Sequence, residues 1–223
     1  MSRFVACLAG CLVVLFGLRT QAAIFTNGSF ETGPSVGAFV TLQENNTSIA
    51  GWKVTVTPTD VNSDTTLDYI GSLWTASHGS RSIDLNGLEP AAIFQTFDTL
   101  AGQEYLVLFD MAGNPDGGPA IKTLAASVGA FNQSYSFDST TTTRSAMGWE
   151  TRAFSFVATG TSSTLTFAST TAGFSGNNQF PQAFGPAIDN VRVLAVPEPA
   201  TLAIWGLGAL GCAIGAYRCR KRV

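Results

Sequence analysis

The feature that most constrains the fold is a series of short segments in which every second residue is apolar. Tyr105, Val107, Phe109 and Met111 are one example. This spacing puts the apolar side chains on a single face of a β-strand. No stretch keeps a helical period for more than two turns, and threonine, serine, glycine, valine and phenylalanine dominate. The sequence therefore predicts an all-β body.

Nine segments predict strands, and turn-forming residues separate them. The expected strands are Gly51–Thr57, Ser82–Leu85, Ala92–Phe97, Glu104–Met111, Thr123–Val128, Gln133–Phe137, Glu150–Val157, Ser163–Ala168 and Ala187–Leu194. Asn86-Gly87 and Ala101-Gly102 are typical of the turns between them. Many short strands with regular turns indicate a β-sandwich, and we expect a jelly roll.

The last segment, residues 196–223, has a different character. Pro197-Glu198-Pro199 ends the strand pattern because proline has no N–H for a ladder. The following eighteen residues, 200–217, carry no charge. As a helix they would span about 27 Å, just short of a hydrocarbon core of about 30 Å. Four cations then end the chain and favour a cytoplasmic location for it. This predicts a transmembrane helix; a buried helix of a soluble domain is the alternative.

The first segment, residues 1–23, has the features of a signal peptide. Arg3 supplies a positive charge, an apolar run extends from Phe4 to Leu18, and small residues at Ala22 and Ala23 offer a cleavage site. Leu8–Cys11 matches a lipoprotein cleavage box, but only seven residues precede it and the apolar run continues beyond it. We expect the mature chain to begin near Ile24.

Cysteine and charge distinguish the body, residues 24–195, from the two ends. All four cysteines lie in the ends, so the body has no disulfide and must be stabilised by one core, for which roughly 170 residues suffice. Six cationic side chains stand against fourteen carboxylates in the body, a net charge of −8. This balance argues against a nucleic-acid partner. It is compatible with a neutral polysaccharide or with divalent cations.

The end of the chain resembles the PEP-CTERM sorting signal. The order of Val196-Pro197-Glu198-Pro199, a short apolar span and an arginine-rich end carries this resemblance. It implies that Pro197, Glu198 and Pro199 are recognised by an exosortase-type sorting enzyme. It also implies a bacterial envelope protein, either membrane-anchored or released at the cell surface.

The body resembles the choice-of-anchor C family, related to a domain of unknown function in plant cell-wall proteins. The blocks that carry this resemblance are Asn27–Glu31, Gly51-Trp52, His78–Gly87, Gln95–Phe97, Phe109–Gly117 and Ala187–Val191. The resemblance implies a galactose-binding-like jelly roll, a fold used by many carbohydrate-binding modules. It brings no catalytic activity with it.

Calcium is the metal that the residues favour. Jelly rolls of the carbohydrate-binding type often join their first and last strands through structural Ca²⁺. Glu31 follows the first motif and Asp189 precedes the last strand, so neighbouring strands would bring these two oxygen ligands together. Asn27 and Asp84 are further candidate ligands. The alternative is that Glu31 is solvated and Asp189-Asn190 forms a turn.

Few residues of the body could support catalysis. His78 is the single histidine, so any nucleophilic triad would depend on it, and a turn residue is the simpler interpretation. Paired carboxylates of a glycosidase would have to lie roughly 5–10 Å apart, a distance that a sequence does not give. Most of the acids adjoin turn residues, where local hydrogen bonds or solvation explain them. We therefore do not expect an enzyme.

Ligand recognition would depend on aromatic residues, since rings stack on sugar faces. Trp74, Phe174 and Phe180 are the candidates, the last two in a long loop. The sequence thus predicts an exported module that binds carbohydrate without catalysis. A purely structural envelope protein and a glycan-active enzyme remain the alternatives.

Overall fold

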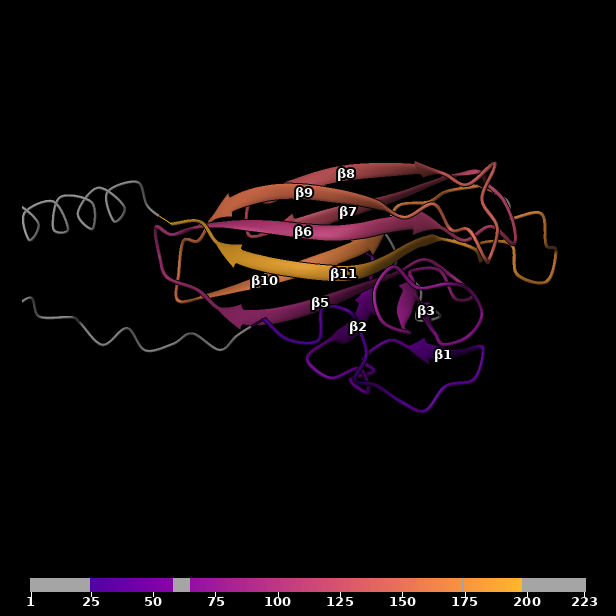
Figure 1. The fold of residues 1–223 in the computed structure, drawn as a ribbon, viewed down its shortest axis with the longest axis horizontal. Coiled ribbons are helices and arrows are strands. Elements are labelled where there is room, and N and C mark those ends of the chain that lie inside the picture. Colours follow the sequence, from indigo (N-terminus) through magenta and orange to yellow (C-terminus); the bar gives the residue numbers. More distant parts are fainter. Residues whose placement is uncertain (1–24, 58–64, 174, 198–223) are drawn as a thin grey trace, which may run out of the picture.

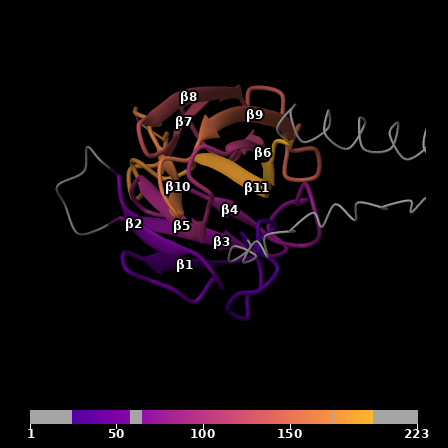
Figure 2. The ribbon, with the colours of Figure 1, turned by 90° about the vertical axis from the view of Figure 1, so that its left-hand side faces the viewer.

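The computed structural model describes residues 25–57, 65–173 and 175–197. They form two antiparallel sheets packed face to face, a β-sandwich. Figures 1 and 2 show the layers from the side and from one end. The expected all-β sandwich is therefore confirmed for the described residues, where eleven strands are assigned.

The first layer is a six-stranded sheet with the order β1-β3-β4-β11-β6-β9. Its strands are β1 (Phe39–Gln43), β3 (Thr66–Ile70), β4 (Ser82–Asp84), β11 (Pro186–Ala195), β6 (Glu104–Gly113) and β9 (Glu150–Val157). The long central pair, β6 and β11, shifts register between Asp189 and Arg192. Asn190 lies in this bulge with a φ of 50°, a conformation that asparagine tolerates better than most residues.

The second layer is a five-stranded sheet with the order β2-β5-β10-β7-β8. Its strands are β2 (Lys53–Val56), β5 (Ala91–Asp98), β10 (Ser162–Ser169), β7 (Ile121–Val128) and β8 (Phe131–Asp138). All of their pairings are antiparallel. Of these strands, only β7 and β8 are consecutive in the sequence, and the other connections cross to the six-stranded sheet. Pairing of β7 with β8 uses a two-residue turn at Gly129 and Ala130.

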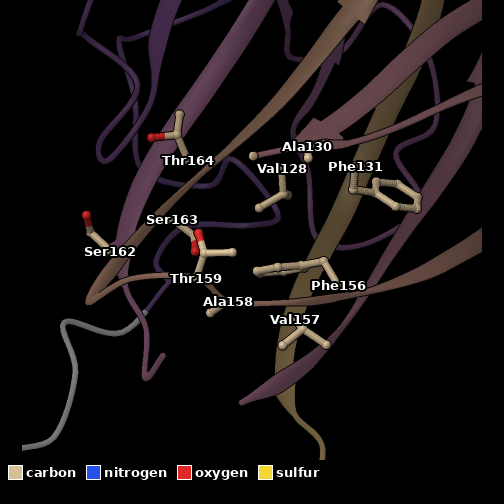
Figure 3. Close-up of a pocket in the computed structure, with 11 residues that line it drawn as sticks. Val128, Ala130, Phe131, Phe156, Val157, Ala158, Thr159, Ser162, Ser163 and Thr164 are labelled. Carbon is tan, nitrogen blue, oxygen red and sulfur yellow. The ribbon is translucent and has the colours of Figure 1, made fainter. Parts of the chain in front are cut away.

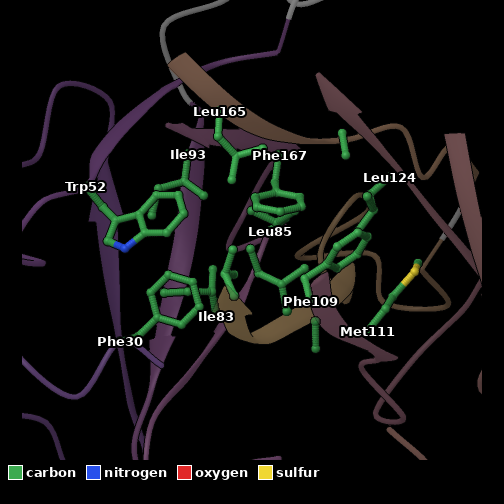
Figure 4. Close-up of a cluster of buried hydrophobic side chains, with 14 of the residues drawn as sticks. Phe30, Trp52, Ile83, Leu85, Ile93, Phe109, Met111, Leu124, Leu165 and Phe167 are labelled. Atoms are coloured by element: carbon green, nitrogen blue, oxygen red, sulfur yellow. The ribbon is translucent and has the colours of Figure 1, made fainter. Parts of the chain in front are cut away.

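The core lies between the two sheets and comes from alternating positions of both, as Figure 4 shows. Val107, Phe109 and Met111 of β6 are fully buried, as the alternation predicts, and they face Leu165 and Phe167 of β10. Phe109 packs edge-on against Phe167 with ring centroids 4.8 Å apart. Burial of this many large apolar side chains is the main favourable term in folding.

All nine expected strands are present, and two further strands, β1 and β3, were not expected. β3 contains Asp68 between Leu67 and Tyr69, and an acidic residue is unfavourable in a strand. Asp68 is accommodated because Thr41 on the paired β1 donates its hydroxyl to the carboxylate at 2.6 Å. This cross-strand contact depends on the fold and has no local signal.

The two ends of the sandwich differ. At the end where β5, β9 and β11 terminate, on the left of Figure 1, lie the turns 99–103, 129–130 and 158–161 and the outgoing residues 196–197. We call this the chain-exit end. Long loops cover the opposite end and the adjacent outer face of the six-stranded sheet. No helix among residues 25–57, 65–173 and 175–197 is long and apolar enough to cross a membrane. The predicted signal peptide and transmembrane helix lie outside the described residues.

Candidate functional site

Several of the sequence blocks that carry the family resemblance meet in one hydrogen-bonded region, which we call the motif cluster: residues 27–31, 77–81, 110 and 189–190. Its first part is the turn 27–31, in which Asn27 and Phe30 have positive φ angles of 53° and 57°. Two buried rings hold it. The Trp52 indole donates to Asn27 O at 3.0 Å, and the Tyr69 hydroxyl donates to Phe30 O at 2.7 Å.

Gly28 explains why this turn needs a glycine. A Cβ at this position would lie 1.8 Å from the backbone oxygen of Val191. In return, the Val191 amide donates to Gly28 O at 2.9 Å, next to the bulge of β11. The turn 27–31 is therefore seated directly on the last strand, which brings the beginning and the end of the body together.

Two carboxylates hold the loop 77–81 from two sides. Glu31 accepts the amides of Ser80 at 2.7 Å and Arg81 at 2.8 Å, and Asp189 accepts the amide of His78 at 2.8 Å. Burial raises the pKa of the Glu31 carboxyl, but the hydrogen bonds from Ser80 and Arg81 outweigh it and the pKa falls below its ordinary value. His78 thus takes part through its backbone.

Asp110 and Asp189 are directly opposite each other on β6 and β11. Asp110 accepts hydroxyls from Ser77 at 2.5 Å and Thr151 at 2.7 Å, and the Asn190 amide at 2.9 Å. These donors lower the pKa of Asp110 although burial opposes them. Burial raises the pKa of Asp189 to about 7, with the charge of Asp110 adding to the shift. The two adjacent carboxyl groups therefore differ in pKa, which is lowered for Asp110 and raised for Asp189, and this difference reduces the repulsion between them.

A second buried acidic pair lies on the same outer face, further toward the loop-covered end. Asp68 and Asp84 are directly opposite on β3 and β4. Burial raises the pKa of Asp68 to about 6 and that of Asp84 to about 7, the latter also through the charge of Asp68. Asp84 accepts the Asn114 side-chain amide at 2.7 Å and the Gly185 amide at 3.0 Å.

Lys122 is a fully buried cation behind this pair. Its Nζ donates to two backbone carbonyls, of Gly117 at 2.7 Å and of Phe184 at 2.5 Å. Burial lowers the pKa of Lys122 to about 8, and the charge of Asp84 acts in the opposite direction. The lysine therefore ties the loops 114–119 and 175–185 to the sandwich.

The predicted calcium ligands are only partly brought together. Glu31 and Asp189 hold the same loop, but amide hydrogens already occupy both carboxylates. Asp84 binds Asn114 and Gly185, while Asn27 accepts the Thr32 amide at 2.9 Å. Among the described residues, no three His, Cys, Asp or Glu side chains are grouped to hold a metal ion. Calcium therefore stays a prediction.

The predicted aromatic ligand residues have three outcomes. Trp74 is only 5% exposed and its indole donates to Ser82 Oγ at 2.8 Å, so it offers no ring face to a ligand, contrary to expectation. It packs inward because this hydrogen bond satisfies its N–H in a buried place. Phe180 is half-buried in the loop 175–185. Phe174 lies outside the described residues.

The open site is a groove at the chain-exit end, with a volume of about 430 Å³. It lies between the turn that joins β7 to β8, the end of β9 and the start of β10, and Figure 3 shows its side chains. It is lined by Val128, Gly129, Ala130, Phe131, Phe156, Val157, Ala158, Thr159, Ser162, Ser163 and Thr164. Every lining residue is uncharged.

The aromatic side of the groove is rigid. Phe156 stacks on Tyr105 with centroids 5.5 Å apart and planes 17° apart. Phe131 stacks on Phe154 at 4.4 Å and 8°. Phe156 is only 7% exposed and belongs to the core, so the half-buried Phe131 is the ring that the groove presents to a ligand.

The polar side of the groove consists of hydroxyls. Ser163 Oγ lies 3.0 Å from Thr99 Oγ1, and Thr164 Oγ1 lies 2.8 Å from Thr96 Oγ1. Only the second pair belongs to the β5–β10 ladder, because Thr99 follows the end of β5. Successive residues of a strand face opposite sides of a sheet, so Ser163 is on the face of the buried Leu165, whereas the Thr164 hydroxyl points to the outer face. Nothing in the sequence selected these residues, because serine and threonine beside a strand start are common in any β protein. Phe156 carried a signal only as a member of an alternating strand, and Phe131 lies before the predicted strand Gln133–Phe137.

The fold and the motif cluster define a class of protein: a β-sandwich without cysteine, in which the first turn packs directly on the last strand. The chain belongs to the family described as protein of unknown function (DUF642), which matches residues 23–194. The PEP-CTERM protein-sorting motif matches residues 195–221, which indicates an exported protein. Of the sorting residues, Pro197 is described, whereas Glu198 and Pro199 lie outside the described residues.

A relative among characterised proteins is halomucin of Haloquadratum walsbyi. It is 32% identical over 184 residues, which are 80% of this chain and 2% of halomucin. The chain therefore spans only a small part of this relative's length.

Two solved carbohydrate-binding modules share the sandwich arrangement at a low level. A family 35 module from Clostridium thermocellum has a TM-score of 0.44 at 12% identity, covering 72% of this chain and 100% of the module. TmCBM61, solved with β-1,4-galactotriose, has a TM-score of 0.42 at 16% identity, covering 78% and 99%. At this level of likeness, the ligands of the two modules say nothing about the ligand of this chain.

Proposed function

We propose that the chain is an exported surface module that binds a neutral polysaccharide without catalysis, and that the groove at the chain-exit end is its binding site. The observation that carries this is the lining of the groove: the ring of Phe131 beside the hydroxyls of Thr159 and Ser163, with no charged residue. Rings stack on the apolar faces of sugars and hydroxyls bond their polar edges. The volume of about 430 Å³ is within the range of about 300–1,000 Å³ for ligand sites.

The carboxylates of the body support a binding role over an enzymatic one. Asp110 and Asp189 face each other, but the hydroxyls of Ser77 and Thr151 bond to Asp110 and the His78 amide bonds to Asp189. Asp84 is fully buried beneath Asn114 and Gly185. A glycosidase needs its two carboxyl groups on either side of a bound sugar. These acids instead hold loops against the sheet.

The proposal also includes the type of jelly roll and the roles of the two terminal segments. The body is a galactose-binding-like jelly roll of the choice-of-anchor C group, and the segment 200–217 holds the chain in a membrane before or instead of its release. Eighteen uncharged residues followed by a basic end support the anchor. The signal peptide, residues 1–23, directs export.

Retention on immobilised polysaccharides tests the proposal. Thr159→Arg puts a bulky charge into a neutral groove at an exposed position and should abolish retention. Ser134→Arg adds the same charge at an exposed position of β8 outside the groove, and should bind as well as the unmodified chain. Melting temperatures of both variants check that they fold.

Equal loss in both variants would place the binding site elsewhere. Failure of the unmodified chain to bind any neutral polysaccharide in a broad panel would reject the carbohydrate role. A purely structural envelope protein would then be the better account.

A further inference from the structure

We infer that the chain-exit end of the sandwich rests on the surface of a lipid bilayer while the tail is in place. This inference rests on the membrane anchor proposed above. It adds the orientation of the body, which the sequence does not address, and it specifies which surface meets the lipid.

The outgoing chain is fixed to this end of the sandwich. The Val196 amide donates to Glu104 O at 2.9 Å, and the Gln103 side chain donates to Val196 O at 2.5 Å. The path of the chain is therefore set up to residue 196. The segment that follows Val196 therefore starts at the chain-exit end.

The distance from this point to the apolar segment is short. Pro197, Glu198 and Pro199 are the only residues between Val196 and the uncharged run that starts at Ala200. Three residues span at most about 10 Å, and the fixed φ of proline removes much of their freedom. The headgroup layer on one side of a bilayer is roughly 5–8 Å thick. A membrane-embedded segment at 200–217 therefore brings the chain-exit end to the headgroups.

The surface at this end suits that position. Leu100, Val157 and Leu194 are 38%, 59% and 51% exposed, and all three lie at the chain-exit end. Val157 is paired with Glu104, and Leu194 with Leu106, on the two sides of β6. We call these three residues the apolar patch. Single exposed apolar residues are common on protein surfaces, so it is the short connection to residue 200 that selects the bilayer as the partner of this end.

One rim of the groove belongs to this contact, because Val157 lines the groove and is also part of the patch. The inference therefore predicts that release of the tail frees a side of the groove. Glu104 at the same end disfavours an anionic surface, so zwitterionic lipid is the suitable test membrane.

The experiment uses the full chain in phosphatidylcholine vesicles that contain a headgroup-linked quencher. Its four native cysteines are replaced by serine, and one cysteine for a fluorescent label is introduced at Val157 or, as the matched control, at Ile121. Ile121 is 49% exposed and starts β7 at the opposite end of the sandwich. Flotation establishes that the chain is on the vesicles. We expect quenching several-fold stronger at position 157 than at position 121.

Three results would overturn the inference: no flotation, equal quenching at the two positions, or self-quenching between labels at position 157. The last would mean that a second copy of the chain covers the patch. None of these results depends on carbohydrate. The retention assay with Thr159→Arg can fail while the label at 157 is still quenched, so the failure of the binding role and the failure of the orientation are distinguishable.

Discussion

The motif cluster and the groove are built in opposite ways. In the motif cluster, nearly every polar atom has a partner within the molecule, as for Glu31 with Ser80 and Arg81. In the groove, uncharged side chains leave an open volume of about 430 Å³. The cluster joins the first turn, the loop 77–81 and the last strand, whereas the groove joins only neighbouring strand ends.

This difference separates the residues that identify the family from those that we propose bind a ligand. A turn seated on a strand, as at Gly28, tolerates few alternatives, so its residues form a recognisable motif. A groove needs only a certain size and a mixture of rings and hydroxyls. Surface loops that carry function vary more readily than the structure that supports them. Motifs in this chain therefore report architecture more than activity.

The sharpest test of this comparison is Gly28→Ala. The added Cβ meets Val191 O at 1.8 Å, so the turn or the last strand must move. Overpacking of this kind costs about 3 kcal/mol, and for a domain of this size we expect a fall of roughly 10 °C in the melting temperature. Gly37→Ala is the matched control, because no atom lies within 4 Å of its Cβ. Similar melting temperatures for both variants would show that the turn is not seated as described.

The second-largest expected effect is a change of the free energy of unfolding with pH. Because burial raises the pKa of Asp68 to about 6, the folded chain holds a proton there at pH values where the unfolded chain has lost it. The free energy of unfolding should therefore decrease as the pH rises from about 4 to about 6, and with Asp84 and Asp189 to about 7. Asp68→Asn should flatten this slope and stabilise the chain at pH 8 by on the order of 1 kcal/mol.

Urea unfolding between pH 4 and pH 8 measures this slope. Asp138→Asn is the control, since hydrogen bonds from Thr140 lower the pKa of Asp138 and its effect on the slope has the opposite sign. A slope unchanged by Asp68→Asn would mean that the carboxylate is solvated in the folded state.

The sequence predicted the strands and the core better than it predicted the groove. Alternation predicted the nine strands, and Phe109 or Phe167 could be placed in the core because period-two spacing reports a buried face. β3 was missed, since Asp68 is stabilised by Thr41 from a strand that is distant in sequence. Trp74 was assigned to a ligand because its partner, Ser82 Oγ, is visible only in three dimensions. The groove combines residues 128–131 with residues 156–164, and no local pattern joins them.

A smaller effect is expected in the groove itself. Phe131→Leu keeps the apolar volume but removes a flat ring face. If the ring stacks on a sugar, the binding free energy should weaken by about 0.5–1.5 kcal/mol, or roughly two- to twelvefold in affinity. Phe131 also stacks on Phe154, so the melting temperature must be measured in parallel. An unchanged affinity in a folded variant would leave the hydroxyl side of the groove as the recognition surface.

The smallest effect should come from removing calcium. Amide hydrogens already hold Glu31 and Asp189, so a cation would add to a loop that is stable without it. We expect EDTA to lower the free energy of unfolding by about 1 kcal/mol or less, with Ca²⁺ restoring it. Glu31→Gln should abolish that response, because it removes the charge that attracts the cation. A melting temperature that EDTA leaves unchanged would exclude calcium. The link between the first turn and the last strand would then consist of the hydrogen bonds of the loop 77–81 and of the direct hydrogen bond from Val191 to Gly28.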